Sequence, residues 1–188
     1  MNRRGQRVKI IDMENETLNS YYASAAYLGL GSNLGDRAAN LLRALKAFRD
    51  AGLNLTAISS IYETGPVDYL DQPDFLNMAV AVSAPWNEPF SLLKLCLDVE
   101  ARLGRKRLTP KGARVIDIDL LLFGGAVIDG IHDGVALTLP HQRLHLRRFA
   151  LAPLAEIAPE LRHPTSGETI RRLLDDLKDS SSVSIYAG

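Results

Sequence analysis

The order of strand-like and helix-like segments between Ala25 and Phe123 limits the possible folds more than any other feature. Short apolar or alternating stretches predict strands over residues 25–31, 53–62, 77–83 and 115–123. Apolar residues at helical spacing predict helices over residues 36–51 and 88–103. The order strand-helix-strand-strand-helix-strand predicts an α+β, ferredoxin-like βαββαβ core, in which both helices cover one face of an antiparallel sheet.

The remainder of the chain extends this core and shows no sign of a second domain. Asp129-Gly130 and Asp133-Gly134 are turn signals for a C-terminal hairpin. Helical patterns follow over residues 147–157 and 168–177. We therefore predict one domain over residues 25–178 and a C-terminal tail over residues 179–188, in agreement with a total length of 188 residues.

Residues 1–24 lie outside the globular pattern. They carry basic residues but no apolar stretch, which argues against a secretory signal. The acidic residues Asp12, Glu14 and Glu16 argue against an organelle transit peptide. We expect a poorly ordered N-terminal extension. The apolar run Leu120–Ile128 is too short to cross a membrane, so we expect no membrane partner.

Charge and cysteine content narrow the classes of function. Lys+Arg and Asp+Glu are 22 each, so the formal net charge is zero, and nucleic-acid binding through bulk charge is disfavoured. Cys96 is the single cysteine, which excludes an internal disulfide and a cysteine-based zinc site. It falls on the apolar stripe of the second helix, where we interpret it as a small core residue. A reducing, cytoplasmic location fits this content.

The sequence Asp117-Ile118-Asp119 is the sharpest local feature of the chain. Successive side chains in a strand point to opposite faces, so both carboxylates share one face and the apolar residues Ile116, Ile118 and Leu120 share the other. Two neighbouring carboxylates repel each other, and a hard cation such as Mg²⁺ relieves that repulsion. The alternative is a solvent-facing strand whose aspartates pair with lysine or arginine.

A strongly basic loop, Arg105–Arg114, directly precedes these aspartates. Carboxylates beside guanidinium groups can form the two halves of a polyphosphate site, because metal and arginines bind different phosphate oxygens. A solvated charge run, or an RNA contact, is the alternative. Gly31–Gly35 precedes a helix and is only a weak phosphate signal, since it lacks the lysine and spacing of a P-loop. His141 and His145 do not have the arrangement of a zinc pair.

Four motifs occur together in the chain: GSNLGDR at Gly31–Arg37, DQPDFLN at Asp71–Asn77, GARVIDIDLLLFG at Gly112–Gly124 and PHQRLHLRRFALAPLAEIAPEL at Pro140–Leu161. With these motifs the chain resembles the 6-hydroxymethyl-7,8-dihydropterin pyrophosphokinases of folate biosynthesis. The resemblance implies that residues 25–178 form a pterin pyrophosphokinase domain with a ferredoxin-like fold. It also implies two Mg²⁺ ions and transfer of the β,γ-diphosphate of ATP to the pterin hydroxymethyl group, which releases AMP.

The resemblance also implies roles for individual residues. It places the metal on Asp117 and Asp119, and it makes Arg105 and Arg114 the catalytic arginines that act on the phosphates. The implied ATP contacts are Glu100, Arg105, Arg107, Arg114, Leu120, Thr138, His141, Gln142 and Arg147. The implied pterin contacts are Gly31, Thr64, Gly65, Val67, Phe75, Asn77 and Phe149. Phenylalanine rings can stack on a flat heterocycle, and the asparagine amide can donate to and accept from its edge.

The chain departs from the family pattern at the substrate loops. Many members carry Trp-Gly-Pro-Arg where this chain has Lys111-Gly112-Ala113-Arg114, and many carry tyrosine where this chain has Gln142. The tryptophan that covers the substrates in those members is therefore absent. We expect the loops 105–114 and 65–73 to move during catalysis.

Two other functions are alternatives to the pyrophosphokinase interpretation. A ferredoxin-like module that binds RNA predicts exposed aromatic residues on the sheet and a basic domain. An ordinary ATP-dependent kinase predicts ADP as the product. We expect neither, and we expect a monomer that acts on small molecules without a nucleic-acid partner. Which group accepts the proton of the pterin hydroxyl is left open between an aspartate, a water and the phosphate.

Overall fold

The computed structural model describes residues 9–10, 25–67, 69–83, 88–105, 112–179 and 181–188. Within them, the main sheet contains six strands: β2 (Ala25–Ser32), β3 (Asn54–Ile58), β4 (Tyr62–Thr64), β5 (Phe75–Ser83), β6 (Asp117–Phe123) and β9 (Val183–Ile185). The strand order is β6-β2-β5-β4-β9, and β3 also pairs with β5. All these pairs are antiparallel, which confirms the predicted sheet.

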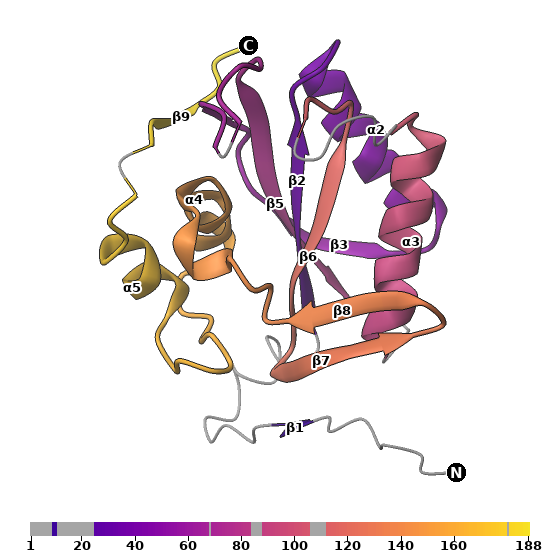
Figure 1. Cartoon of the computed structure of the whole chain (residues 1–188), viewed down its shortest axis with the longest axis vertical. Helices are drawn as coiled ribbons and strands as arrows, with labels where there is room; N and C mark the ends of the chain where they lie inside the picture. Colours follow the sequence, from indigo (N-terminus) through magenta and orange to yellow (C-terminus); the bar gives the residue numbers. More distant parts are fainter. Residues whose placement is uncertain (1–8, 11–24, 68, 84–87, 106–111, 180) are drawn as a thin grey trace.

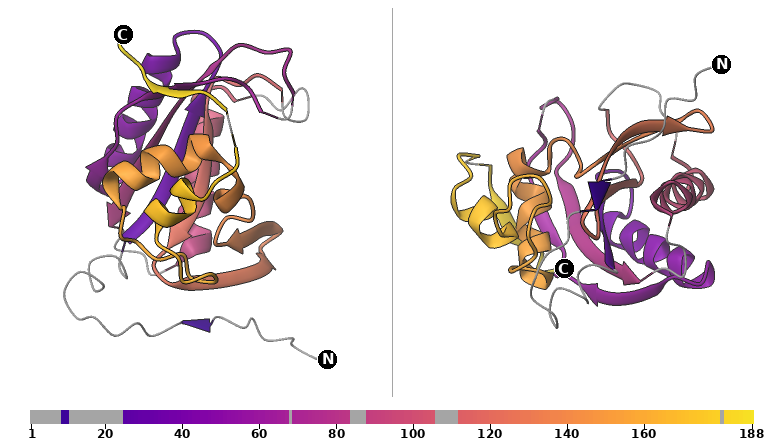
Figure 2. Two further views of the ribbon diagram at one scale, coloured as in Figure 1. Left: turned by 90° about the vertical axis from the view of Figure 1, so that its left-hand side faces the viewer. Right: turned by 90° about the horizontal axis from the view of Figure 1, so that it is seen from below.

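Helices cover both faces of this sheet (Figures 1 and 2). One face carries α2 (Arg37–Asp50) and α3 (Pro89–Arg102), the two helices of the predicted βαββαβ core. The other face carries α4 (Arg148–Ile157) and α5 (Ile170–Asp175), which follow the short helix η1 (Leu144–Leu146). A smaller sheet joins β1 (Lys9–Ile10), β7 (Ala126–His132) and β8 (Val135–Leu139). Among the described residues, no helix has the length and apolar character needed to span a bilayer.

The alternation of side chains along β2 divides the interior into two cores. Ala26, Leu28 and Leu30 pack on the side of α2 and α3, together with Ile118 and Leu120 of β6. Ala25 and Tyr27 pack on the side of α4 and α5. The predicted orientation of β6, with Ile118 and Leu120 toward the first two helices, is therefore confirmed. Cys96 is fully buried in the first core, as predicted.

Two local expectations are wrong. The predicted strand 53–62 is two strands, β3 and β4, because Ser59 interrupts their ladder with β5. The Ser59 hydroxyl accepts a hydrogen bond from Ala79 N (2.9 Å), at a place where a strand would offer its carbonyl. Asp129-Gly130 lies within β7, whereas Asp133-Gly134 alone forms the hairpin turn, with φ of 49° and 78°.

Both ends of α2 follow the sequence signals. Asp36 caps the helix by accepting a hydrogen bond from Ala39 N at 3.0 Å. Gly52, just after the helix, has φ of 85°, a left-handed conformation that glycine adopts without strain. The segment predicted as a C-terminal tail contributes β9, which pairs with β4 at the edge of the main sheet. Residues 1–8 and 11–24 of the predicted extension lie outside the described residues.

Candidate active site

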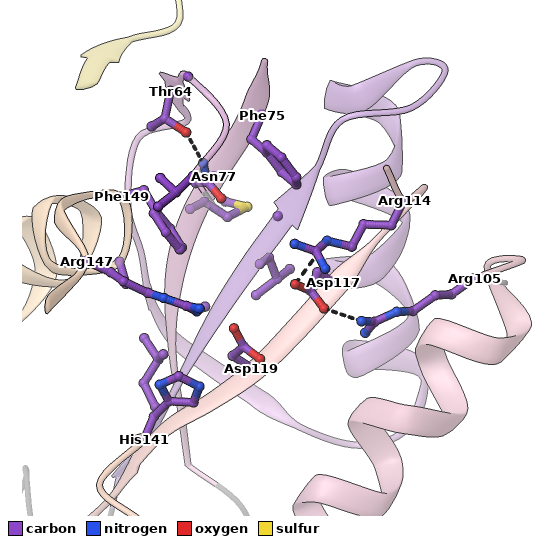
Figure 3. Close-up of a pocket in the computed structure, with 18 residues that line it drawn as sticks. Thr64, Phe75, Asn77, Arg105, Arg114, Asp117, Asp119, His141, Arg147 and Phe149 are labelled. Atoms are coloured by element: carbon purple, nitrogen blue, oxygen red, sulfur yellow. Dashed lines mark hydrogen bonds and ion pairs between the residues drawn. The ribbon is translucent and has the colours of Figure 1, made fainter. Parts of the chain in front are cut away.

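A cavity lies on the α4 side of the sheet, beyond the part that α4 covers (Figure 3). Its floor is a row of cross-strand neighbours in which Gly31 of β2 is paired with Asp117 of β6 and with Asn77 of β5. One step along the same face, Gly29 is paired with Asp119. Because the β2 residues of these rows have no side chain, the floor is open between the carboxylates on one side and the amide on the other.

Two aromatic rings from different elements border the cavity. Phe75 begins β5 and Phe149 lies in the first turn of α4, and both line the cavity. Between them, Asn77 Nδ2 donates a hydrogen bond to Thr64 Oγ1 at 2.7 Å. This bond fixes the amide with its Oδ1 on the Gly31 side, where a Cβ on that glycine would come within 2.9 Å of it. The cavity thus offers ring faces and an oriented acceptor.

Three arginines point into the cavity (Figure 3). Arg105 and Arg114 converge on one carboxylate: Arg105 Nη2 lies 2.6 Å from Asp117 Oδ1, and Arg114 Nε lies 3.2 Å from Asp117 Oδ2. The Arg114 guanidinium also lies over the Phe75 ring at 5.3 Å, and Arg147 lies over the Phe149 ring at the same distance. Cationic groups are therefore placed between the aromatic walls and the carboxylates.

The second carboxylate, Asp119, lies in a different environment. Arg105 and Arg114 direct their ion pairs to Asp117 rather than to Asp119. Burial raises the pKa of Asp119, and the Asp117 carboxylate raises it further, whereas His141, Arg147 and Arg114 oppose this shift. Burial lowers the pKa of His141, against the influence of Asp119. The site therefore places a poorly compensated carboxylate beside an imidazole whose protonated form is disfavoured by burial.

These donors fit a magnesium site completed by the substrate. The described residues contain no cluster of three or more metal-ligating side chains, and Asp117 and Asp119 are the carboxylates that line the cavity among them. Mg²⁺ is commonly held by one or two carboxylates together with phosphate oxygens and water. The charge repulsion that raises the pKa of Asp119 is also what a divalent cation would remove.

Glu100 of α3 is buried behind the cavity and contacts both the strand of the aspartates and Arg105. Its side chain is 3% exposed and is absent from the described lining of the cavity. Glu100 Oε1 accepts a hydrogen bond from Ile118 N at 2.7 Å and forms an ion pair with Arg105. Burial raises the pKa of Glu100, and Arg105 opposes this shift. The residue joins the strand that carries the aspartates to the arginine that faces them.

A second hollow adjoins the cavity and shares Asp119, His141 and Arg147 with it. Leu120, Thr138 and Gln142, all implied as ATP contacts by the sequence, line this second hollow. Gln142 Nε2 donates to Thr138 Oγ1 at 3.2 Å, which closes one side of it. Two neighbouring volumes that meet at charged residues can hold a nucleotide and a second substrate.

The structure brings most of the predicted site residues together. All seven residues implied as pterin contacts line the first cavity, as do Arg105, Arg114, His141, Arg147 and both aspartates. Glu100 lies behind the cavity, and Arg107 lies outside the described residues. The sequence analysis missed Gly29, whose signal was its period-two spacing from Gly31 on the same strand face.

Fold and site together define a class of protein. A pair of same-face carboxylates, convergent arginines and a cavity with aromatic walls, all on one α+β sheet, are the parts of an enzyme that transfers a phosphate-containing group to a flat substrate.

Comparison with known proteins gives the family. The family model of 7,8-dihydro-6-hydroxymethylpterin-pyrophosphokinase matches residues 27–159. The 2-amino-4-hydroxy-6-hydroxymethyldihydropteridine pyrophosphokinase of Bacillus subtilis is 43% identical over 160 residues, which cover 84% of this chain and 93% of the relative. The protein of the same name from Methylorubrum extorquens is 46% identical over 156 residues, which cover 82% of this chain and 94% of the relative. The chain belongs to the 7,8-dihydro-6-hydroxymethylpterin-pyrophosphokinase family.

A solved structure agrees with the fold. The Plasmodium falciparum HPPK-DHPS protein superposes with a TM-score of 0.66 at 18% identity, and the match covers 80% of this chain but 45% of that longer one. By its family and the two bacterial relatives, the chain is a pyrophosphokinase: it transfers the β,γ-diphosphate of ATP to 6-hydroxymethyl-7,8-dihydropterin in folate biosynthesis. The predicted family, fold and activity are confirmed.

Proposed function

We propose that the cavity over Gly31 is the pterin site of this enzyme and that the adjoining hollow holds the nucleotide. The main support is that residues from β2, β4, β5, β6 and α4, far apart in the sequence, line one cavity. The pterin ring stacks against Phe75 and Phe149, whose side chains border the open floor. Asn77 Oδ1 accepts a hydrogen bond from the ring edge, because Thr64 already holds the Nδ2 side of that amide. Gly31, Gly65 and Val67 complete the contacts.

The nucleotide lies across the three residues that both hollows share. Its base enters the hollow of Leu120, Thr138 and Gln142, and its phosphates extend past His141 and Arg147 toward the aspartates. The Arg147 guanidinium on this path, and those of Arg105 and Arg114 at its end, match the negative charge of a triphosphate. Arg107 is proposed as a further ATP contact from the sequence alone, whereas Glu100 acts on ATP through Arg105, which it holds in place.

Asp117 and Asp119 are the proposed ligands of two Mg²⁺ ions. When bound, Mg²⁺ neutralises phosphate charge and lowers the pKa of the attacking hydroxyl. Arg105 and Arg114 share Asp117 in this structure, so their guanidinium groups lie beside the place that the phosphates must reach. There they can donate to the β- and γ-phosphate oxygens, on which charge develops during transfer.

The transfer itself is a single displacement at phosphorus. The pterin hydroxymethyl oxygen forms a bond to the β-phosphorus, and the bond from this phosphorus to the α,β-bridging oxygen breaks. The bridging oxygen leaves with AMP, and the hydroxyl proton is released to the solvent as the third product. The cavity walls hold the pterin in position for attack, and the arginines stabilise charge on the transferred group.

We further propose that the protein acts on these small molecules as a monomer in the cytoplasm, without a nucleic-acid or membrane partner. A formal net charge of zero gives no general attraction for nucleic acid. The sheet face that would bind RNA carries Asp117 and Asp119, which repel phosphate unless a cation is present.

Variants of the two aspartates test the proposed site. Asp117→Asn and Asp119→Asn should each lower kcat by about a hundredfold or more, as expected when charge stabilisation of a transition state is lost. Asp119→Asn removes a poorly compensated buried charge, so its melting temperature should be at least that of the wild type. Asp117→Asn deprives both arginines of a partner and should melt lower.

The exposed Asp98 of α3 supplies the control, because Asp98→Asn removes a carboxylate that lines neither hollow and should change neither quantity. Nucleotide products are separated by chromatography with and without EDTA. AMP in step with pterin consumption, abolished by EDTA, is expected. Near-normal turnover in both site variants, or ADP as the product, contradicts the proposal.

A further inference from the structure

Arg37, the first residue of α2, contacts three segments that are separate in the sequence. Its Nη2 lies 2.8 Å from Glu63 Oε1 of β4, and its Nη1 donates to the Asp74 carbonyl oxygen at 2.9 Å. Its guanidinium also lies 5.9 Å from the ring centre of Tyr186, which follows β9. Neither Arg37 nor Tyr186 is among the described residues that line the cavity.

The two polar contacts fall beside residues of the proposed pterin site. Glu63 directly precedes Thr64, and Asp74 directly precedes Phe75. Thr64 and Phe75 are opposite each other in the β4–β5 ladder and close the two ends of the segment 65–74, described except for residue 68. One guanidinium therefore joins both ends of the segment that carries Gly65 and Val67 into the cavity.

Tyr186 is itself held by the edge of the sheet. β9 pairs with β4, with Ser184 opposite Glu63, and Tyr186 N donates to the Ile61 carbonyl oxygen at 2.8 Å. Upstream, Asp179 fixes the same segment to α4 by accepting a hydrogen bond from Arg148 N at 3.0 Å. Figures 1 and 2 show this C-terminal segment running from α5 to the edge of the sheet.

We propose that Arg37, supported by Tyr186, is a positioning residue for the pterin side of the active site. Its planar guanidinium can serve the carboxylate, the carbonyl and the ring at once, which a lysine ammonium cannot do. Arg37 and Glu63 are partly exposed, with side-chain exposures of 25% and 37%, so their pair contributes little to global stability. What it fixes is the separation and orientation of Thr64 and Phe75.

This inference rests on the proposed location of the pterin, and its consequence is a selective effect on one substrate. The contacts of Arg37 with Glu63 and Asp74 act as a clamp on the segment 65–74. Without this clamp, pterin binding must itself order the two ends of the segment, and the cost of ordering reduces the net binding energy. ATP binds on the β6 and β8 side, away from these contacts. Removing the clamp should therefore weaken apparent pterin affinity and leave that of ATP unchanged.

The test compares Arg37→Ala, Arg37→Lys and Tyr186→Leu in the full chain. Both Arg37 variants should raise the pterin KM about five- to tenfold, the factor that a lost charge-assisted contact represents. Tyr186→Leu should raise it less. Tyr186→Phe keeps the ring and should match the wild type, as should Arg49→Ala, which removes an exposed arginine at the far end of α2. The ATP KM should stay within about twofold in every variant.

Hydrogen exchange of the substrate-free protein gives a readout independent of pterin placement. In the Arg37 variants, amides next to the clamp, at residues 63–65 and 74–77, should exchange faster, while those of α2 and β2 stay unchanged. An unchanged pterin KM in Arg37→Ala, equal changes in both KM values, or faster exchange throughout the sheet overturns the inference. Asn77→Ala is measured in parallel: if it leaves the pterin KM unchanged, the proposed pterin site fails, whereas the exchange result still decides whether Arg37 orders the segment.

Discussion

Gly31 shows how one missing side chain creates room for a substrate. It is paired with Asp117 on one side and Asn77 on the other, so the row across the sheet consists of a carboxylate, a bare backbone and an amide. A Cβ added there would come within 2.9 Å of Asn77 Oδ1, closer than real Cβ contacts allow. Because Thr64 holds the other end of that amide, the asparagine cannot move aside freely.

Gly31→Ala should therefore act on pterin binding. We expect the methyl group to displace the Asn77 amide and to fill the floor of the cavity, raising the pterin KM by roughly tenfold or more, since a misplaced polar contact costs on the order of 1–3 kcal/mol. The ATP KM should change little. Steady-state kinetics with each substrate varied in turn measures both effects.

Gly130→Ala is the matched control for this variant. Gly130 is also a strand glycine, but a Cβ there would meet no atom within 4 Å, so kinetics should be unchanged. A pterin KM equal to that of the wild type in Gly31→Ala would show that the substrate does not lie over this row.

At the scale of residues, the sequence predicts a site residue when its place in a strand alone determines which face it lies on. Asp117 and Asp119 share a face because strand side chains alternate, and the cavity confirms that orientation. The contact of Glu100 with Arg105 and Ile118 could not be derived, because it depends on how α3 packs against β6. Its inclusion as an ATP contact came from the family resemblance, while the structure shows it one layer further from the cavity.

At the scale of elements, the junction between α3 and β6 determines where Arg105 points. Glu100 lies in the last turns of α3, and its carboxylate accepts from Ile118 N in the strand that carries both aspartates. The same carboxylate pairs with Arg105, three residues after the helix ends at Arg102. A helix, a strand and the start of the basic loop thus meet at one buried side chain.

Two substitutions separate the roles of this carboxylate. Glu100→Gln keeps an oxygen that can accept from Ile118 N but loses the charge that holds Arg105, so kcat should fall about tenfold with a small change in stability. Glu100→Ala leaves a buried N–H and a partly buried guanidinium without this partner, and it should lower the free energy of unfolding by about 2–4 kcal/mol. Urea unfolding measures the stability of both variants, and steady-state kinetics measures their kcat.

The result that would contradict this account is specific. If Glu100→Gln were as unstable as Glu100→Ala, the charge rather than the strand hydrogen bond would be structural. An exposed acidic residue of the same helix, in the variant Asp98→Asn, should alter neither stability nor kcat.

The observed boundaries of helices and strands show which sequence signals are sufficient to predict where an element begins and ends. Periodicity together with Asp36 and Gly52 defined α2 closely, because the cap and the left-handed glycine act locally. The break between β3 and β4 was not predictable, since it arises when the Ser59 hydroxyl replaces a ladder carbonyl, which requires β5 alongside. Similarly, Asp129-Gly130 has the composition of a turn, but pairing of Asp129 with Thr138 places it within the hairpin strands.

At the scale of the whole molecule, the two cores of the described residues depend on the segments from Ala25 onward. Residues 1–24 and 179–188 both lie outside the domain predicted from the sequence. The structure distinguishes them. The C-terminal segment pairs β9 with β4 and places Asp179 at the start of α4, whereas the described N-terminal contact is the two-residue strand β1 on β7.

Deleting each end in turn should give opposite results. Removal of residues 1–24 should leave the melting temperature and both KM values close to those of the full chain, because the cores and the cavity keep all their described residues. Removal of residues 179–188 takes away the Asp179 contacts with Arg148 and the β9 ladder. A loss of about 2–3 kcal/mol from such contacts corresponds to a fall of roughly 5–10 °C in a domain of this size. Thermal unfolding with and without ATP and Mg²⁺ measures both truncations. A large fall in melting temperature after removal of residues 1–24, or no fall after removal of residues 179–188, would contradict this assignment of the two ends.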